Sequence, residues 1–505
     1  MPTNMSRRKF LGAAMAPAVF QVVPRHVVGR GYVAPNDKIT LGYIGLGTQG
    51  LRELGPLLAS PAIQIVAVCD PNRESDDYVD WSRNALRNTI RHLIGKPNWR
   101  AGMDGIPGGR EVGREVVETY YANERSKETF TGVSSYADFR EMLEKESSLD
   151  AVKVMTPDHL HAAIAIAAMK EGKHVLMHKP LANRVSEARL VIETARESNV
   201  ATYFLPWDAN GSMEPIMGWI KDGAIGTLRE IHNWSNRPIW PQYQTLPTDT
   251  PPIPDGFDWD LWLGPATYRP YHPHYTHAVF RGWYDFGGGA IADMGHYSLW
   301  SVFKALDLGV PTSVEATPSV AAEITDHVSS TIRNDYSFPI ACTIRFKFAA
   351  TANRQPLELF WYDGGMRPPT PDELMEDNRE MPIEGMMFVG DRGKILSGFL
   401  LDDPRIIPAR KMREYGVQPP SGSRDRRRRD ELPRGVAGWI AACKDGRYVP
   451  GNFLEAAPIS ETFNLGAVAL RIGRRIEYDA ATMKITNIPE ANKYLTREYR
   501  SGWEL

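Results

Sequence analysis

The segment from Lys38 to Asp70 constrains the fold more than any other part of the chain. An apolar run from Lys38 to Ile44 leads into three glycines, and a helical pattern of leucines follows at positions 51, 54, 57 and 58. A second apolar run, Ile63 to Cys69, ends at Asp70, twenty residues after Gly50. This order of strand, glycine turn, helix and strand predicts a βαβ unit with parallel strands.

The glycine turn suits the phosphates of a dinucleotide. Gly45 permits the tight turn, Gly47 lets the backbone approach a pyrophosphate, and Gly50 lets helix and strand pack closely. We therefore expect a cofactor-binding loop made of Gly45, Leu46, Gly47, Thr48, Gln49 and Gly50. Asp70 is placed to accept hydrogen bonds from the adenosine ribose, and its charge would repel a 2′-phosphate, which favours NAD over NADP. The alternative is a cluster of turn glycines with a chance aspartate.

Polar residues follow two later strands. The apolar run at residues 150–155 leads into Thr156, Pro157, Asp158 and His161, and the short run 173–177 leads into His178, Lys179 and Pro180. Open α/β sheets bind ligands beyond the carboxyl ends of their strands. We therefore expect both groups to lie beside the cofactor.

The length of 505 residues is too great for one core and predicts several domains. Residues 1–30 resemble a twin-arginine export signal, because Ser6-Arg7-Arg8-Lys9-Phe10-Leu11 precedes an apolar stretch that ends at Val23. A basic N-terminal arm is the alternative. We predict an exported protein, periplasmic or secreted, with a nucleotide-binding domain at 37–205 that contains a helical insertion at about 73–136, and a second domain at 206–505.

Charge and cysteine content exclude several classes of function. Lys plus Arg (59) nearly balances Asp plus Glu (61), so no basic field favours nucleic acid or acidic lipid. The three cysteines are too few and too scattered for a disulfide framework or a zinc knuckle. No stretch after the signal approaches the roughly 18 apolar residues of a membrane span.

The second domain is rich in aromatic residues. Tryptophans stand at 207, 219, 234, 240, 259, 262 and 283, among the arginines 237, 269 and 281. Such residues can stack on sugars and bind their hydroxyls, although each tryptophan can equally belong to the core. The stretches 329–334 and 341–348 alternate in polarity and predict strands of an antiparallel sheet with one covered face.

A glycine run at 287–289 predicts the start of a helix from about Ile291 to Leu306. A separation of three places Asp293 and His296 on one face of that helix, where a carboxylate and an imidazole could relay a proton. The substrate-side candidates just before the run are His277, Arg281, Trp283 and Tyr284. Three histidines between Tyr271 and His277 could ligate a metal, but we expect a polar sugar-facing loop there and no metal.

These motifs resemble the glucose-fructose oxidoreductase, inositol dehydrogenase and rhizopine-catabolism (Gfo/Idh/MocA) oxidoreductases. The resemblance rests on the glycine loop, on Thr156-Pro157 with His161, on Lys179-Pro180 and on the segment 287–296. It implies a Rossmann sheet followed by an α+β domain with a large, mostly antiparallel open sheet, whose exposed face makes a homo-oligomer, a dimer or tetramer. It also implies that Lys179 acts with Asp293 and His296 as a catalytic residue. Two features depart from the family: His178 stands where Glu is usual, and Asp293 and His296 are three residues apart where four is common.

Three functions remain open at this point. The first is an exported oxidoreductase that oxidises a secondary hydroxyl, at C3, of a sugar or glycoside and retains its NAD tightly. The second, known among relatives in the family, is a glycosidase that oxidises C3 transiently, eliminates the aglycone, adds water and reduces again. The third is an accessory protein that only binds sugar or NAD.

Overall fold

The glycine turn lies in a parallel sheet of six strands. The strand order is β3-β2-β1-β4-β5-β6, and every pair is parallel. The order reverses between β1 and β4, which is the position where sheets of this kind bind dinucleotides. The strands are β1 (Ile39–Ile44), β2 (Ile63–Cys69), β3 (Ser134–Tyr136), β4 (Ala151–Val154), β5 (His174–Met177) and β6 (Thr202–Phe204).

This computed structural model describes residues 37–126, 130, 132–204, 211–332, 334–416 and 432–505. The expected export segment lies outside the described residues, as do residues 205–210 at the expected domain boundary. Residues Ile39–Leu505 form one unit and are considered by themselves here. In the described parts of the chain, no helix combines the length and apolarity needed to cross a membrane.

Helices connect the parallel strands, and two of them belong to the expected insertion. The connecting helices are α2 (Thr48–Arg52), α3 (Leu54–Ala59), α6 (Phe139–Lys145), α7 (His161–Lys170) and α8 (Val185–Glu197). The insertion contributes α4 (Ala85–Leu93) and α5 (Arg110–Glu124), whose buried faces pack on the same hydrophobic cluster as β1 and β2. Residues 73–136 thus contain these two helices, with β3 at their end.

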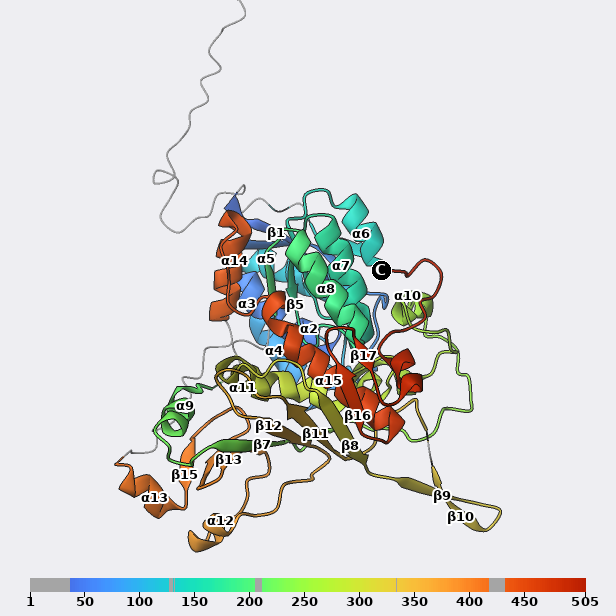
Figure 1. Cartoon of the computed structure of the whole chain (residues 1–505). Helices are drawn as coiled ribbons and strands as arrows, with labels where there is room; N and C mark the ends of the chain where they lie inside the picture. Colours follow the sequence, from blue (N-terminus) through green and yellow to red (C-terminus); the bar gives the residue numbers. More distant parts are fainter. Residues whose placement is uncertain (1–36, 127–129, 131, 205–210, 333, 417–431) are drawn as a thin grey trace, which may run out of the picture. The chain divides into compact units, whose positions relative to one another are not determined.

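The second half of the chain builds a nine-stranded sheet, seen in the lower part of Figure 1. Its order is β15-β14-β13-β7-β12-β11-β8-β16-β17, and only the β7–β12 pair is parallel. This confirms the fold class: a parallel Rossmann sheet and a large, mostly antiparallel second sheet. Its strands are β7 (Leu228–Trp234), β8 (Ser313–Pro318), β11 (Cys342–Phe348), β12 (Leu357–Tyr362), β13 (Gly385–Gly390), β14 (Lys394–Ser397), β15 (Arg405–Ile407), β16 (Ile476–Asp479) and β17 (Lys484–Ile485).

The two alternating stretches had different outcomes. The stretch 341–348 forms β11, and its burial alternates along the strand as expected. The stretch 329–334 was expected in the same sheet, and this was wrong: β10 (Val328–Ile332) pairs only with β9 (Ala321–Thr325), in a separate two-stranded arm whose side chains are mostly exposed. Alternation alone does not show which side of a strand is covered, because that depends on neighbours distant in sequence.

The C-terminal part of the chain returns to the first sheet. In α14 (Arg434–Asp445), the Trp439 indole donates to the carbonyl of Ala201 beside β6. The long helix α15 (Ala457–Ile472) packs against both α8 and β8, and Figure 1 shows it between them. Buried residues of both sheets consequently join one hydrophobic cluster. The remaining helices are α9 (Glu214–Lys221), α10 (Trp259–Leu263), α11 (His296–Leu306), α12 (Asp372–Glu376) and α13 (Ala409–Glu414).

Candidate active site

The glycine loop between β1 and α2 has the geometry that only glycine allows at two positions. Gly45 has φ +95°, and a Cβ there would lie 2.6 Å from the Met155 carbonyl carbon. A Cβ on Gly50 would lie 2.1 Å from the Gly45 carbonyl oxygen. Any larger residue at these positions would push β1, β4 and α2 apart. Because both are glycine, the loop stays tight and its backbone can lie close to a bound ligand.

Asp70 lies at the end of β2 against this loop. Its carboxylate accepts from the backbone N–H of Leu46 (2.7 Å) and of Asn72 (2.9 Å). Burial raises the pKa of Asp70, and these two hydrogen bonds oppose the rise. The side chain therefore fixes the glycine loop as well as lying where a ribose would be recognised.

The loop after β4 contains a polar atom with no partner in the protein. The hydroxyl of Thr156 is buried and makes no hydrogen bond among the described residues. Its backbone nitrogen lies beside Gly45. A buried hydroxyl at the switch point of the sheet, next to an open glycine loop, fits a bound dinucleotide, which would supply the missing partner.

A segment of the insertion, Ser75–Asp80, covers the glycine loop, and we call it the strap. A Cβ on Gly47 would lie 3.1 Å from the Tyr78 ring, so that ring stands directly over the loop. The Thr48 hydroxyl donates to the Val79 carbonyl (2.8 Å). The far side of the strap is held by His277, whose ring lies 3.9 Å from that of Tyr78 and whose Nε2 lies 3.1 Å from Asp77.

Two expected cofactor residues instead join loops to one another. His161 lies between two backbone carbonyls, that of Thr156 (2.9 Å from Nε2) and that of Pro180 (2.5 Å from Nδ1). Asp158, just after Pro157, accepts from the backbone N–H of Gly288 (3.0 Å). Both side chains therefore bind backbone groups of neighbouring loops and fix the positions of those loops.

Lys179 forms a tight charged group with two residues of the second half. Its Nζ donates to Asp293 Oδ1 (2.5 Å), and Arg281 Nε lies 3.2 Å from the same oxygen. Burial lowers the pKa of Lys179, and the charge of Asp293 opposes this. Burial alone would raise the pKa of Asp293, but the charges of Lys179 and Arg281 hold it well below its usual value. The carboxylate is thus ionised at neutral pH and holds the ammonium through its hydrogen bond.

His296, expected to share a face with Asp293, makes no hydrogen bond to this group among the described residues. The expected single helix begins as a π-turn at Ile291–Gly295, and only then continues as α11. A π-turn contains one extra residue, which rotates His296 away from Asp293. The His296 Nδ1 instead donates to the Ala292 carbonyl (2.9 Å), and its ring packs between Phe204 and Phe463. Burial lowers its pKa to about 3, so the ring is neutral.

The next residue, Tyr297, takes the place beside Lys179 that was expected for His296. Lys179 Nζ lies 5.3 Å from the centre of the Tyr297 ring. Tyr297 was missed, although the family spacing of four residues after Asp293 ends on it. The sequence therefore contained a signal for Tyr297: the family places its histidine four residues after the aspartate, and here that position is Tyr297.

A chain of polar groups leads from Tyr297 toward the glycine loop. The Tyr297 hydroxyl lies 2.7 Å from His178 Nε2, and His178 Nδ1 lies 3.0 Å from Glu53 Oε1. The other carboxylate oxygen of Glu53 lies 3.0 Å from Lys153 Nζ, on the buried face of β4. Burial lowers the pKa of His178 to about 4, against the charge of Glu53. Neutral His178 can accept at Nε2 from Tyr297, while its buried Nδ1 lies close to the Glu53 carboxylate without forming a hydrogen bond among the described residues.

The substrate-side candidates separate into three places. Arg281 lies in the Lys179 group, with its guanidinium 5.7 Å from the Trp240 ring, whose buried indole N–H has no partner among the described residues. His277 holds the strap. Trp283 is buried and donates to the His274 carbonyl (2.6 Å), and the ring of Tyr284 lies against Phe338.

The aromatic residues of the second half are mainly core. Every tryptophan of the expected sugar-facing set that the structure describes is at most 6% exposed. Trp207 lies outside the described residues. Of the two alternatives, the described tryptophans thus fit the core, and Trp259, Trp262 and Trp283 share one buried cluster.

The histidine loop shows no metal-binding arrangement. His272 Nδ1 accepts from the backbone of His274, and the His274 ring stacks on Tyr243 at 3.7 Å. In the described ranges, no group of three or more His, Cys, Asp or Glu residues could hold a metal ion. These histidines instead pack with neighbouring aromatic rings.

A Rossmann sheet with a glycine loop at its switch point and a buried lysine–carboxylate pair beside it define a nicotinamide-dependent oxidoreductase. Comparison with family models agrees with this class. Residues 93–204 match the model described as "Oxidoreductase family, NAD-binding Rossmann fold", and residues 213–356 match the "C-terminal alpha/beta domain" of the same family. The chain belongs to the Gfo/Idh/MocA oxidoreductase family, and its first domain binds NAD.

Its known relatives are distant. A "Glycosyl hydrolase family 109 protein" of Shewanella baltica is 25% identical over 244 residues, 45% of this chain and 44% of the relative. A "Levoglucosan dehydrogenase" of Pseudarthrobacter phenanthrenivorans is 29% identical over 114 residues, 21% of this chain and 29% of the relative. The alignments thus span less than half the length of these curated relatives. Among solved structures, a levoglucosan dehydrogenase complex with NADH and levoglucosan has a TM-score of 0.48 at 14% identity, covering 87% of this chain and 99% of the other.

Proposed function

We propose that the protein oxidises a secondary hydroxyl, at C3, of a sugar or glycoside and retains its NAD tightly. The observation that carries this proposal is the group formed by Lys179, Asp293 and Arg281 together with the chain Tyr297–His178–Glu53. His178 and Lys179 directly follow β5, and Glu53 lies at the end of α2. Arg281 lies in the short helical turn His277–Gly282, and Asp293 and Tyr297 lie in the π-turn and at the start of α11. An alcohol oxidation requires a group that accepts the hydroxyl proton and a group that stabilises the oxygen that loses it. The chain from Tyr297 to Glu53 can accept the proton, and the Lys179 group can stabilise the oxygen.

The residues divide the work as follows. NAD, when bound, supplies the acceptor for the hydride. The Lys179 ammonium donates a hydrogen bond to the reacting oxygen and stabilises its developing negative charge. The Tyr297 hydroxyl takes up the substrate proton while passing its own to His178 Nε2, and the Glu53 carboxylate stabilises the imidazolium that forms.

The strap supports tight retention of the cofactor. It is anchored to the glycine loop through Thr48 and to the second half through His277, so its opening breaks contacts on both sides. A cofactor lying on the glycine loop would meet the Tyr78 ring on its outer side. Retention suits an enzyme that works where no pool of free NAD exists.

Replacing Tyr78 by Ala should loosen the cofactor. We expect loss of bound NAD to become about tenfold faster, because a buried aromatic contact of about 1.4 kcal/mol would be removed. The measurement is the fraction of NAD that remains after extended dialysis of the purified protein. Trp81→Ala, which changes an exposed ring (54%) immediately after the strap, is the control. Equal retention in Tyr78→Ala and wild type would show that the strap does not hold the cofactor.

A second candidate function is a glycosidase that uses the same oxidation transiently. The relatives named as family 109 glycosyl hydrolases and an "Alpha-N-acetylgalactosaminidase" of Shewanella oneidensis, 24% identical over 244 residues, favour it. Incubation with nitrophenyl glycosides separates the two. Phenol release over many turnovers without net NADH supports the glycosidase, whereas accumulation of a keto-sugar supports the dehydrogenase.

We also propose export through the twin-arginine route, as the motif Arg7-Arg8 suggests. Folding before export would let the protein acquire NAD in the cytoplasm. Fractionation of cells that express the wild-type chain and an Arg7→Lys/Arg8→Lys variant tests this. The variant should remain in the cytoplasm, and equal distribution of the two proteins would contradict the proposal.

Finally, we propose a homo-oligomer in which the β9–β10 arm contacts a second copy of the chain. The arm exposes an apolar side chain on each of its faces, Ile324 (77%) on one and Val328 (65%) on the other, and either could contact a second copy. We expect Ile324→Asp to lower the mass measured by light scattering toward the 56.6 kDa of one chain. Ile253→Asp, at another exposed isoleucine (48%), should leave the mass unchanged. A wild-type mass of one chain would rule the oligomer out.

A further inference from the structure

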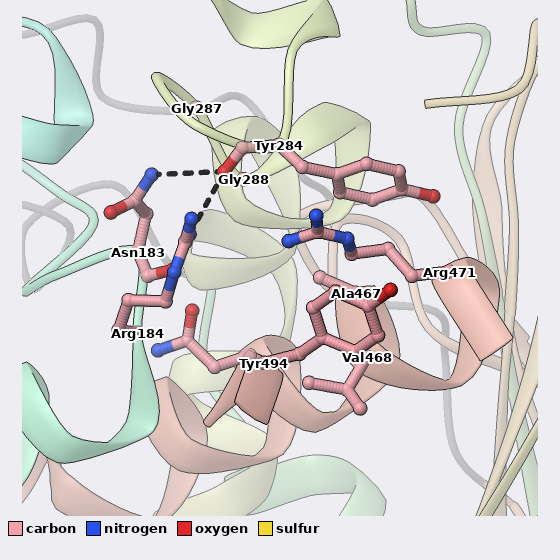
Figure 2. A pocket seen from close by; sticks show the side chains of 10 residues that line it. Asn183, Arg184, Tyr284, Gly287, Gly288, Ala467, Val468, Arg471 and Tyr494 are labelled. Atoms are coloured by element: carbon pink, nitrogen blue, oxygen red, sulfur yellow. Dashed lines mark hydrogen bonds between the residues drawn. The ribbon is translucent and has the colours of Figure 1, made fainter. Parts of the chain in front are cut away.

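A small pocket outside the Lys179 group lies between the start of α8, helix α15 and the turn at Tyr284–Gly288 (Figure 2). Its walls include Asn183 and Arg184 from the segment after Pro180, and Arg471 from the end of α15. The space admits the centre of a water-sized occupant within about 10 Å³. It therefore holds one water molecule or one ion of similar size, and not a sugar or a phosphate.

Arg471 enters this pocket without a counter-ion. Its guanidinium lies between the rings of Tyr284 (4.9 Å) and Tyr494 (4.0 Å), and Figure 2 shows it pointing toward the Arg184 side. Its Nε is buried and has no hydrogen-bond partner, and in the described part of the chain it forms no ion pair. The Tyr494 hydroxyl donates a hydrogen bond to Asp335 Oδ2 (3.0 Å). The two tyrosine rings thus hold the Arg471 guanidinium so that it points into the pocket.

Arg184, on the opposite wall, is also incompletely satisfied. Its terminal nitrogens donate to the carbonyls of Asn183 and Tyr284 and approach Asp285 (3.3 Å). Its Nε is buried with no partner among the described residues. Burial and the neighbouring charge of Arg497 lower the pKa of Arg184 to about 9.

Positive charge exceeds negative charge around the pocket. Asp285 lies in the field of four arginines, at positions 184, 269, 471 and 497. Asp285 forms ion pairs with Arg269 and Arg184. A second carboxylate, Glu187, lies 2.6 Å from Arg497 Nε. Within these ion pairs, the guanidiniums of Arg184, Arg269 and Arg497 share two carboxylates, and Arg471 forms no ion pair among the described residues. A buried excess of this kind is costly unless an anion compensates it.

We propose that this pocket binds one small monovalent anion of the size of chloride, between Arg184 and Arg471. The anion lies against the Arg471 guanidinium, whose terminal nitrogens point toward the Arg184 side (Figure 2), and reduces the repulsion between the two guanidiniums. The pocket is walled by the segment that follows Lys179 and by Gly287–Gly288, which precede Asp293. Occupancy therefore stabilises the two segments that carry the catalytic pair. The proposal does not depend on which reaction the site catalyses.

Thermal unfolding of the full-length protein tests this inference. We expect Tm to rise by a few degrees, and to saturate, with sodium chloride or bromide but not with sodium gluconate at equal ionic strength. Arg471→Gln, which keeps a planar group between the two tyrosines, should lose this response. Arg474→Gln, at an exposed arginine just beyond α15, should retain it.

A bromide-soaked crystal gives a readout that does not require a variant. Anomalous scattering should show one bromide between Arg184 and Arg471. Bromide only at exposed positions, an adventitious ion only, would overturn the proposal. An equal salt response in Arg471→Gln and wild type would overturn it as well.

Discussion

Lys179→Met is expected to lower kcat by about 10²–10⁴-fold, because it removes the donor that stabilises the oxygen as its proton leaves. The methionine keeps the length and apolar stem of lysine but brings no charge and no N–H. Asp293 keeps Arg281 as a partner 3.2 Å away, so the fold should persist. The measurement is the single-turnover rate of NADH formation at 340 nm with saturating sugar.

The control for this variant is Lys173→Met. Lys173 stands just before the same strand, β5, and its Nζ donates only to the Leu149 carbonyl (2.8 Å). Lys173→Met should keep the wild-type rate, and both variants should contain as much NAD as the wild type. A Lys179→Met enzyme with full activity would remove the proposed chemistry and would favour a protein that only binds sugar or NAD.

Tyr297→Phe is expected to lower kcat by about 10²–10³-fold with little change in KM, because the hydroxyl is needed for proton transfer rather than for packing. The chain offers a closely matched control. On the second sheet, the Tyr362 hydroxyl lies 3.0 Å from His232 Nδ1, and His232 Nε2 lies 3.0 Å from Glu230. Tyr362→Phe removes an equivalent hydrogen bond outside the Lys179 group and should leave kcat unchanged.

The pH profile distinguishes a proton chain from a structural role. Because burial lowers the pKa of His178 to about 4, Nε2 remains free to accept a proton above that pH. The wild-type rate should therefore hold as pH falls through 6.5 and drop only as pH falls through about 4, measured after brief pH jumps. His178→Gln should be slow throughout and should lack this limb. An acidic limb near pH 6.5 in the wild type would contradict the proposed role of His178.

Local sequence patterns predicted the first sheet well. The run Ile63–Cys69 is β2 residue for residue, and the turn at Gly45 and Gly50 admits no other side chain. The positive φ of Gly45 and the contact of Gly50 with the Gly45 carbonyl are local, although Met155, distant in sequence, also crowds Gly45. Lys179 and Asp293 were also predicted, because motifs mark them.

The partners within the site were harder to predict. His296 was expected in the site, yet one π-turn placed Tyr297 there. Glu53 carries no motif, and it meets His178 only because α2 and β5 lie at the same edge of the parallel sheet. His277 was expected beside the substrate, but it holds the strap.

By itself, then, the sequence determined the βαβ unit, the preference for NAD and the positions of Lys179 and Asp293. Only the tertiary structure decided which groups surround them. It brought Tyr297, His178 and Glu53 together, and it placed Arg471 opposite Arg184 with no ion pair among the described residues. The physical reason is range: backbone geometry is set by near neighbours, whereas the protonation and pairing of buried groups depend on residues brought together from distant parts of the chain.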